Sequence, residues 1–142
     1  MKELIETYYH EGMGYNPFFI RDNWQVAQLN FTDEQGLYAI KKMDKHMETD
    51  EVFVLTKGTA VLIGAVIVNE HFDFQLKKME IGTTYNIPVN LWHNIAMDKD
   101  AEVIIIEKSN THLGDFDYKD LNKNETEHLN NMIYRLINGT TL

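Results

Sequence analysis

The middle of the chain is a succession of short β-prone runs separated by turn residues, and this pattern constrains the fold most. Residues 51–55 (EVFVL) are β-branched and aromatic, and residues 60–68 form a second such run. In residues 72–76, apolar and polar side chains alternate strictly, as in a strand with one buried face. Further candidate strands cover residues 24–29, 36–40, 85–88, 92–96 and 101–106. Many short strands at close spacing predict an all-β sandwich or barrel.

The C-terminal part has helical periodicity instead. Asn124 is the predicted N-cap, and Glu127, three residues later, completes a capping box. Apolar residues follow at helical spacing, and Gly139 stands where a C-cap is expected. We therefore predict an amphipathic helix over residues 124–138, packed on the outside of a barrel whose core covers about residues 22–110.

Length and composition fit one folded domain, which we expect to comprise residues 1–142. Hydrophobic residues make up 44% of the chain and charged residues 25%, values typical of a folded globular protein. The chain has no cysteine, which excludes a disulfide scaffold, a thiolate metal site and a cysteine nucleophile.

Charge and hydrophobicity disfavour two classes of partner. Thirteen Lys and Arg residues against 22 Asp and Glu residues give a net charge of -9, which repels nucleic acid and anionic lipid. The N-terminus has no apolar segment of the signal-peptide type, and the longest apolar run, residues 60–68, is far shorter than the roughly 20 residues of a membrane helix. We expect a cytoplasmic protein without nucleic-acid or membrane partners.

Polar residues with metal-ligand chemistry gather in two places. Asp44 and His46 are two residues apart, so on a strand they would share a face. Glu51 shares a face with Phe53, which places a carboxylate at the end of an apolar row, where it must be paired, protonated or bound to a cation. His93 follows a turn and begins its own strand. If these strands are neighbours, two imidazoles and one or two carboxylates converge.

Nitrogen and oxygen ligands of this kind suit a divalent transition metal, namely Mn, Fe, Zn, Co or Ni. A bound ion with open positions could polarise a substrate oxygen or activate a water. Tyr85 is the candidate catalytic residue, because a phenol near a metal can act as an acid or base. His112, just past the last core strand, is placed to cover the mouth of a barrel.

The two clusters resemble the two motifs of the cupin superfamily. The first motif has His-x-His, three or four residues, Glu, six residues and Gly; the second has Gly, five residues, Pro-x-Gly, two residues and His. The matching residues are His46, Glu51 and Gly58 in the first motif and Gly82, Pro88 and His93 in the second. The resemblance implies a double-stranded β-helix, or jelly roll, in which His46, Glu51 and His93 are three of the four usual metal ligands.

Three positions depart from the family pattern. Asp44 replaces the first histidine, so it is a fourth ligand, a hydrogen-bond partner of an imidazole, or simply a carboxylate at the end of a strand. Asn90 replaces the motif glycine, a mild change because Asn tolerates a left-handed backbone. Met97 replaces the final Asn of the second motif.

Two functions from different classes follow from the resemblance. The first is a small metal-dependent enzyme, an isomerase, lyase or oxygenase, acting on a small polar molecule, with carbohydrate-type substrates favoured. The alternative is a non-catalytic small-molecule binding or sensing module with a degenerate metal site. The resemblance also implies a homodimer formed through the N-terminal region, where Phe18, Phe19, Trp24 and Phe31 supply apolar surface. A structural protein that uses only the barrel surface is a third possibility.

Overall fold

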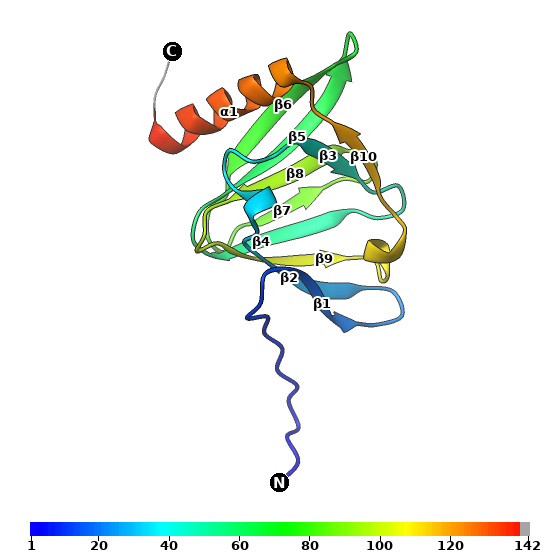
Figure 1. Ribbon diagram of the computed structural model, residues 1–142. Helices are drawn as coiled ribbons and strands as arrows, with labels where there is room; N and C mark the ends of the chain where they lie inside the picture. Colours follow the sequence, from blue (N-terminus) through cyan, green and yellow to red (C-terminus); the bar gives the residue numbers. More distant parts are fainter. Residues whose placement is uncertain (140–142) are drawn as a thin grey trace.

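The computed structural model describes residues 1–139, in which ten strands form two five-stranded sheets that face each other (Figure 1). The first sheet has the order β1 (Gly14–Ile20), β2 (Gln25–Asn30), β9 (Glu102–Glu107), β4 (Glu51–Lys57) and β7 (Thr84–Ile87). The second has the order β10 (Asp117–Asp120), β3 (Lys42–Lys45), β8 (Trp92–Met97), β5 (Ala60–Val68) and β6 (His71–Lys78). All neighbouring strands within the sheets are antiparallel. The predicted jelly-roll fold is confirmed.

Strand β5 explains how the two sheets and the helix are held together. Its residues Ala60 and Leu62 belong to the hydrophobic core between the sheets, whereas Val61 and Ile63 belong to a second core beneath the C-terminal helix. A strand buried on both faces requires apolar residues at successive positions. The uninterrupted apolar run of residues 60–65 is therefore the sequence signature of a strand covered on both sides.

Helix α1 (Lys123–Asn138) lies across the outside of the second sheet, beside β6 (Figure 1). Its Leu129 and Ile133 are fully buried in the second core. The predicted cap is wrong by two residues: Asn122 is the N-cap, and it exchanges hydrogen bonds with Glu125 in a capping box. Gly139 is the predicted C-cap and has the left-handed conformation, with φ of 65°.

Strands extend beyond the predicted barrel limits at both ends. Strand β1 was not predicted from the sequence, because Pro17 interrupts the run of β-prone residues. In the structure this proline lies at a register shift between Asn16 and Phe19. Proline is tolerated there because β1 is an edge strand. Residues 36–40, predicted as a strand, are a loop in which Ile40 is buried, so their apolar character reflects packing rather than strand pairing.

Two short 3₁₀ turns complete the described chain: η1 (Asp33–Gln35) precedes this loop, and η2 (Thr111–Leu113) follows β9. Within residues 1–139, no helix has the length and hydrophobicity needed to cross a membrane.

Candidate metal centre

A cavity of about 300 Å³ lies between the two sheets and is here called the central cavity. Its wall combines apolar core side chains with several Asp, Glu, His and Tyr side chains. The lining residues are Tyr15, Leu29, Gln35, Asp44, His46, Glu51, Phe53, His93, Asn94, Ile95, Ile105, Glu107, Thr111, His112, Phe116 and Tyr118. Buried titratable groups are costly unless they are paired, so such a concentration marks a candidate functional site.

Cross-strand pairing brings the key side chains together. In the first sheet, Glu51 at the start of β4 lies directly opposite Glu107 at the end of β9. In the second sheet, Asp44 on β3 lies directly opposite His93 on β8. Directly opposed residues of neighbouring strands share a face, and here both pairs line the central cavity. Each sheet therefore contributes one pair of polar side chains to the same interior space.

The structure brings His46, Glu51 and His93 into one cluster. His46 Nε2 lies 2.6 Å from Glu51 Oε2, and His93 Nε2 lies 3.5 Å from Glu51 Oε1. The three potential ligand atoms all lie within 4.8 Å of one another. Glu51 and His93 are buried, and His46 is half-buried. One carboxylate thus faces two imidazole nitrogens from different parts of the chain.

The second nitrogen of each imidazole is occupied by the backbone. His46 Nδ1 lies 2.6 Å from the carbonyl oxygen of Asp115, and His93 Nδ1 lies 3.0 Å from that of Leu91. A carbonyl can only accept, so Nδ1 donates in both rings. The Nε2 atoms are thereby directed toward Glu51, which is the arrangement that orients metal-binding histidines in proteins.

The electrostatics of the cluster favour an ion pair when no metal is bound. Burial opposes the charge on His46, but the hydrogen bond to Glu51 and the charge of that carboxylate raise the pKa of His46 to about 9. Burial likewise opposes ionisation of Glu51, but hydrogen bonds from His46 and His93 hold its pKa well below the usual range. A cation entering the cluster must therefore displace a proton from His46.

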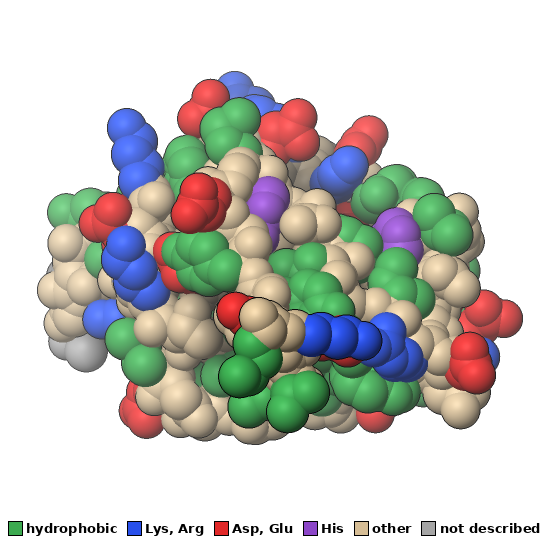
Figure 2. Space-filling view, turned by 90° about the horizontal axis from the view of Figure 1, so that it is seen from below, with side chains coloured by type: hydrophobic (Ala, Val, Ile, Leu, Met, Phe, Trp, Pro, Cys, Tyr) green, Lys and Arg blue, Asp and Glu red, His purple; other side chains and the backbone are tan. Residues whose placement is uncertain are grey.

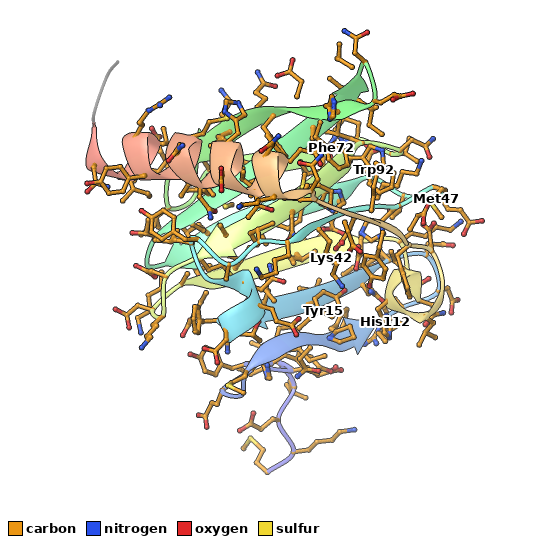
Figure 3. The ribbon with its side chains drawn as sticks, turned by 45° about the horizontal axis from the view of Figure 1, so that its top comes forward. Tyr15, Lys42, Met47, Phe72, Trp92 and His112 are labelled. Carbon is orange, nitrogen blue, oxygen red and sulfur yellow. The ribbon has the colours of Figure 1, made fainter. Side chains whose placement is uncertain are left out.

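A second polar group, absent from the sequence predictions, lies beside this cluster. The Tyr15 hydroxyl donates to Glu107 Oε1, and Gln25 Nε2 lies 3.2 Å from the same oxygen and 3.3 Å from His112 Nδ1. Figure 3 shows Tyr15 and His112 next to each other, with ring centroids 6.2 Å apart. The structure places the His112 side chain in the cavity wall.

Glu107 could have been found from the sequence. Val103, Ile105 and Glu107 alternate on one face of β9, and all three are buried. A carboxylate therefore ends an apolar row, which is the same signal that marked Glu51. Burial and the neighbouring charge of Glu51 raise the pKa of Glu107 to about 8. At neutral pH Glu107 is thus predominantly an uncharged acid next to an ionised one.

Asp44 lines the central cavity, but its carboxylate is not part of the cluster formed by His46, Glu51 and His93. Burial raises the pKa of Asp44 to about 6, and its Oδ1 atom is buried without a hydrogen-bond partner. The structure therefore places Asp44 next to the cluster rather than in it.

Tyr85 does not reach the central cavity. It lies on β7 opposite Phe53, packs against the core between the sheets, and its hydroxyl accepts a hydrogen bond of 2.9 Å from the backbone N–H of Glu80. The tyrosine that the structure does bring to the cavity is Tyr15.

The residues present fit a divalent transition metal ion. Two imidazole nitrogens and one carboxylate are a common ligand set for such ions, and both rings already have the backbone hydrogen bond that fixes a metal-binding tautomer. In addition, Asp44 Oδ1 and Glu107 Oε2 are buried without partners. Buried oxygens normally have a partner, so a proton, a water molecule or a cation is expected to complete this site.

Comparison with known proteins identifies the fold. No protein-family model and no curated protein matches the sequence. Among solved structures, a cupin-2 domain protein of Shewanella frigidimarina matches with a TM-score of 0.50 and 19% identity, over 70% of this chain and 84% of that one. Two variants of Streptomyces PAC13, each solved with uridine, match with TM-scores of 0.54 and 0.53 and 12% identity. They cover 78% and 76% of this chain, and the matches span 78% of each PAC13 chain.

These matches agree with the two stacked antiparallel sheets of this chain. The chain has the jelly-roll fold of the cupin superfamily.

Proposed function

We propose that this protein is a metal-dependent enzyme that binds one divalent transition ion through His46, Glu51 and His93. The observation that carries the proposal is the orientation of the two imidazoles. Their Nδ1 atoms are occupied by the backbone carbonyls of Asp115 and Leu91, so both Nε2 atoms face Glu51. Bound there, the ion would supply a Lewis acid for a substrate oxygen.

The chain's own residues would shape how a substrate is held. Glu107, uncharged at neutral pH, donates or accepts a hydrogen bond beside Glu51. Tyr15 and Gln25 hold the Glu107 side chain through its Oε1 atom, which leaves Oε2 as the oxygen that carries the proton. An acid of this kind next to a metal centre suits proton transfer to or from a bound molecule.

The charge of the cavity wall supports a particular class of substrate. Three carboxyl groups line it, and none of the described lining residues is Lys or Arg. Phosphate or other strongly anionic groups would meet no Lys or Arg there, and the imidazolium of His46 is already paired with Glu51. The wall instead offers acceptors, which favour a small neutral molecule with several hydroxyl groups, such as a carbohydrate-type compound. Isomerisation, elimination and oxygenation are all compatible with this chemistry.

The test of metal binding is elemental analysis of untagged protein. We would compare the wild type with a His46→Ala/His93→Ala double variant and with a matched control, His71→Ala/His128→Ala, which removes two exposed surface histidines. The expected result is close to one ion per chain in the wild type and the control, and none in the site variant. Circular dichroism establishes that all three proteins are folded.

The test of the substrate class follows with the metal-loaded protein. Thermal shifts would be measured with a panel of sugars, polyols and nucleosides, and turnover of each binding compound would be followed by NMR. Because two PAC13 structures contain uridine, uridine belongs in the nucleoside set. If the wild type takes up no Mn, Fe, Zn, Co or Ni even after incubation with each ion, the enzyme proposal fails.

One observation favours a second candidate, a non-catalytic binding module without metal. His46 and Glu51 form a complete ion pair at 2.6 Å, and Asp44, at the position of a fourth ligand, lies outside the cluster. Such a module would bind a small hydroxyl-rich molecule without converting it. It predicts a ligand-induced thermal shift that persists in the presence of EDTA, with unchanged NMR spectra of the ligand over time.

A further inference from the structure

His46 is the one residue of the candidate metal cluster that lies outside the strands. Strand β3 ends at Lys45, so no ladder of backbone hydrogen bonds fixes the orientation of His46. One contact anchors its backbone: the N–H of Asn90 donates to the His46 carbonyl over 2.7 Å. This contact leaves the direction of the imidazole ring unspecified.

Asp115 holds the same loop from the other side, 69 residues further along the chain. Its carbonyl oxygen accepts from His46 Nδ1 over 2.6 Å. Its carboxylate accepts from two successive backbone N–H groups, with Oδ1 at 2.8 Å from the nitrogen of Met47 and Oδ2 at 3.0 Å from that of Glu48. A single residue thus binds the imidazole and the two residues that follow it.

Asp115 belongs to a segment, residues 111–118, that we call the strap. The strap leads from η2, after strand β9 of the first sheet, into β10 at the edge of the second sheet (Figure 1). Four of its residues line the central cavity: Thr111, His112, Phe116 and Tyr118. Strand β10 pairs with β3, the strand that leads into His46. The strap therefore forms part of the cavity wall and also contacts the loop that carries His46.

We propose that Asp115 is a positioning residue, which fixes His46 in its orientation toward Glu51 from a segment that forms part of the wall of the central cavity. The inference rests on the proposed function in so far as His46 is a metal ligand. Two charge-assisted hydrogen bonds to successive amides are a strong and geometrically specific clamp. The same segment therefore supplies part of the cavity wall, through Thr111, His112, Phe116 and Tyr118, and orients the ligand, through Asp115.

The experiment compares Asp115→Ala and Asp115→Asn with the matched controls Asp117→Ala and Asp117→Asn. Asp117 lies two residues away in the strap, is exposed, and has a side chain that accepts only from the neighbouring N–H of Tyr118. Asp115→Ala removes both acceptors from the loop, whereas Asp115→Asn keeps one. The changes in amide exchange, NOE contacts and metal affinity should therefore be larger in Asp115→Ala than in Asp115→Asn. The control variants should resemble the wild type in all three measurements.

Two measurements need no metal. Amide hydrogen exchange at Met47 and Glu48 should accelerate about tenfold or more in Asp115→Ala, because these amides lose their acceptors. The rings of His46 and His93, whose centroids are 5.2 Å apart, should give NOE contacts in the wild type that weaken in the variant. A third measurement, the affinity for Mn²⁺ or Zn²⁺, should fall about 10- to 100-fold.

These outcomes separate the two proposals. If the wild type binds no metal, the proposed function fails, while the exchange and NOE measurements still test Asp115. If exchange accelerates but the NOE contacts and the metal affinity stay unchanged, the strap merely covers the loop and the positioning role is overturned. Unchanged exchange in Asp115→Ala, with the protein folded by circular dichroism, overturns it as well.

Discussion

Glu51 and Glu107 lie directly opposite each other on β4 and β9, so two carboxyl groups face the same cavity from neighbouring strands. Their environments push their pKa values apart: His46 and His93 hold the pKa of Glu51 low, and burial beside Glu51 raises that of Glu107 to about 8. Two carboxyl groups with separated pKa values in one site are a common basis of acid–base chemistry. The pair also makes the stability of the protein depend on pH.

The metal-free protein should lose stability as the pH rises toward and through 8. An unfolded glutamic acid ionises near its usual value of 4.5, whereas Glu107 in the folded chain ionises near 8. Between these values the folded state holds a proton that the unfolded state has released, so raising the pH favours unfolding. Glu107→Gln, which mimics the protonated side chain, should be more stable than the wild type at pH 9 by on the order of 2 kcal/mol, after allowing for screening.

Urea unfolding at pH 5, 7 and 9 in the presence of EDTA would measure this effect. At pH 5 the variant and the wild type should differ little. Glu127→Gln, on the exposed face of helix α1, removes the same charge outside the cavity and serves as the control. A Glu107→Gln advantage that is equal at all three pH values would contradict the assignment of a raised pKa to Glu107.

Metal affinity should increase with pH up to about 9. Below that pH, His46 carries a proton on the nitrogen that would bind the ion, and binding must release it. The affinity should therefore rise by roughly tenfold per pH unit between 7 and 9. Calorimetric titration in two buffers with different ionisation enthalpies counts the protons released. Binding without proton release at pH 7 would show that His46 is neutral in the free protein.

The two glycines of the sequence motifs should differ strongly in their tolerance of alanine. Both have positive φ, 78° for Gly58 and 84° for Gly82. A Cβ atom at Gly58 would lie 2.6 Å from the backbone of Ala101, whereas one at Gly82 would meet nothing within 4 Å. We expect Gly82→Ala to cost about 1 kcal/mol of stability and Gly58→Ala several times more, as measured by thermal unfolding. Equal costs would show that the contact at Gly58 relaxes freely.

The helix cap offers a direct comparison of sequence prediction and structure. Asn122 accepts from the backbone N–H of Glu125 over 2.8 Å, whereas Asn124 is exposed within the first turn of α1. Asn122→Ala should therefore cost about 1 kcal/mol. Asn124→Ala should be neutral or slightly stabilising, since Ala has the higher helix propensity. Thermal melts of the two variants decide between the two positions, and a larger loss for Asn124→Ala would favour the cap expected from the sequence.

The sequence allowed prediction of features whose signal lies within a few neighbouring residues, but not of features that depend on contacts between distant parts of the chain. The runs around Phe53, Ala65 and Phe74 carry their strand signal within a few residues, and the motif spacing around His46 and His93 is local as well. The contribution of Asp115 could not be predicted, because it depends on a strap that returns from a distant part of the chain.

Two elements differ from the sequence prediction for different reasons. Strand β1 is supported by pairing with β2 despite Pro17, and the N-cap is shifted because Glu125 also accepts a hydrogen bond from the backbone of Phe72 in β6. For the N-cap, a partner distant in sequence overrides the local pattern, whereas β1 is supported by the strand that directly follows it.

The N-terminal region leads us to expect a homodimer. The N-terminal end of the chain extends away from the sheets (Figure 1), but Tyr8 packs against Phe18 and Phe19 of β1, which is an edge strand of the first sheet. Phe19 stacks against Trp24, which is 45% exposed. Figure 2 looks onto this end of the molecule and shows hydrophobic side chains scattered among charged ones. An exposed strand edge with apolar neighbours is a ready surface for a second copy.

Light scattering should give twice the chain mass of 16.6 kDa. Trp24→Asp should shift the protein toward the monomer, whereas Tyr134→Asp, at an exposed tyrosine of helix α1, should not. A wild type that is monomeric at all accessible concentrations would refute the homodimer.

The candidate ligands come from both layers of the sandwich: Glu51 belongs to the first sheet, and His93 belongs to the second. An ion bound to both residues would cross-link the two sheets at one end of the barrel. Metal binding would then reduce the relative motion of the two sheets. Apolar residues between the sheets, such as Phe53, would affect metal affinity because they set the distance between the sheets and so between the ligands. Mutations deep in the core should therefore be able to change the metal affinity without altering any polar side chain of the site.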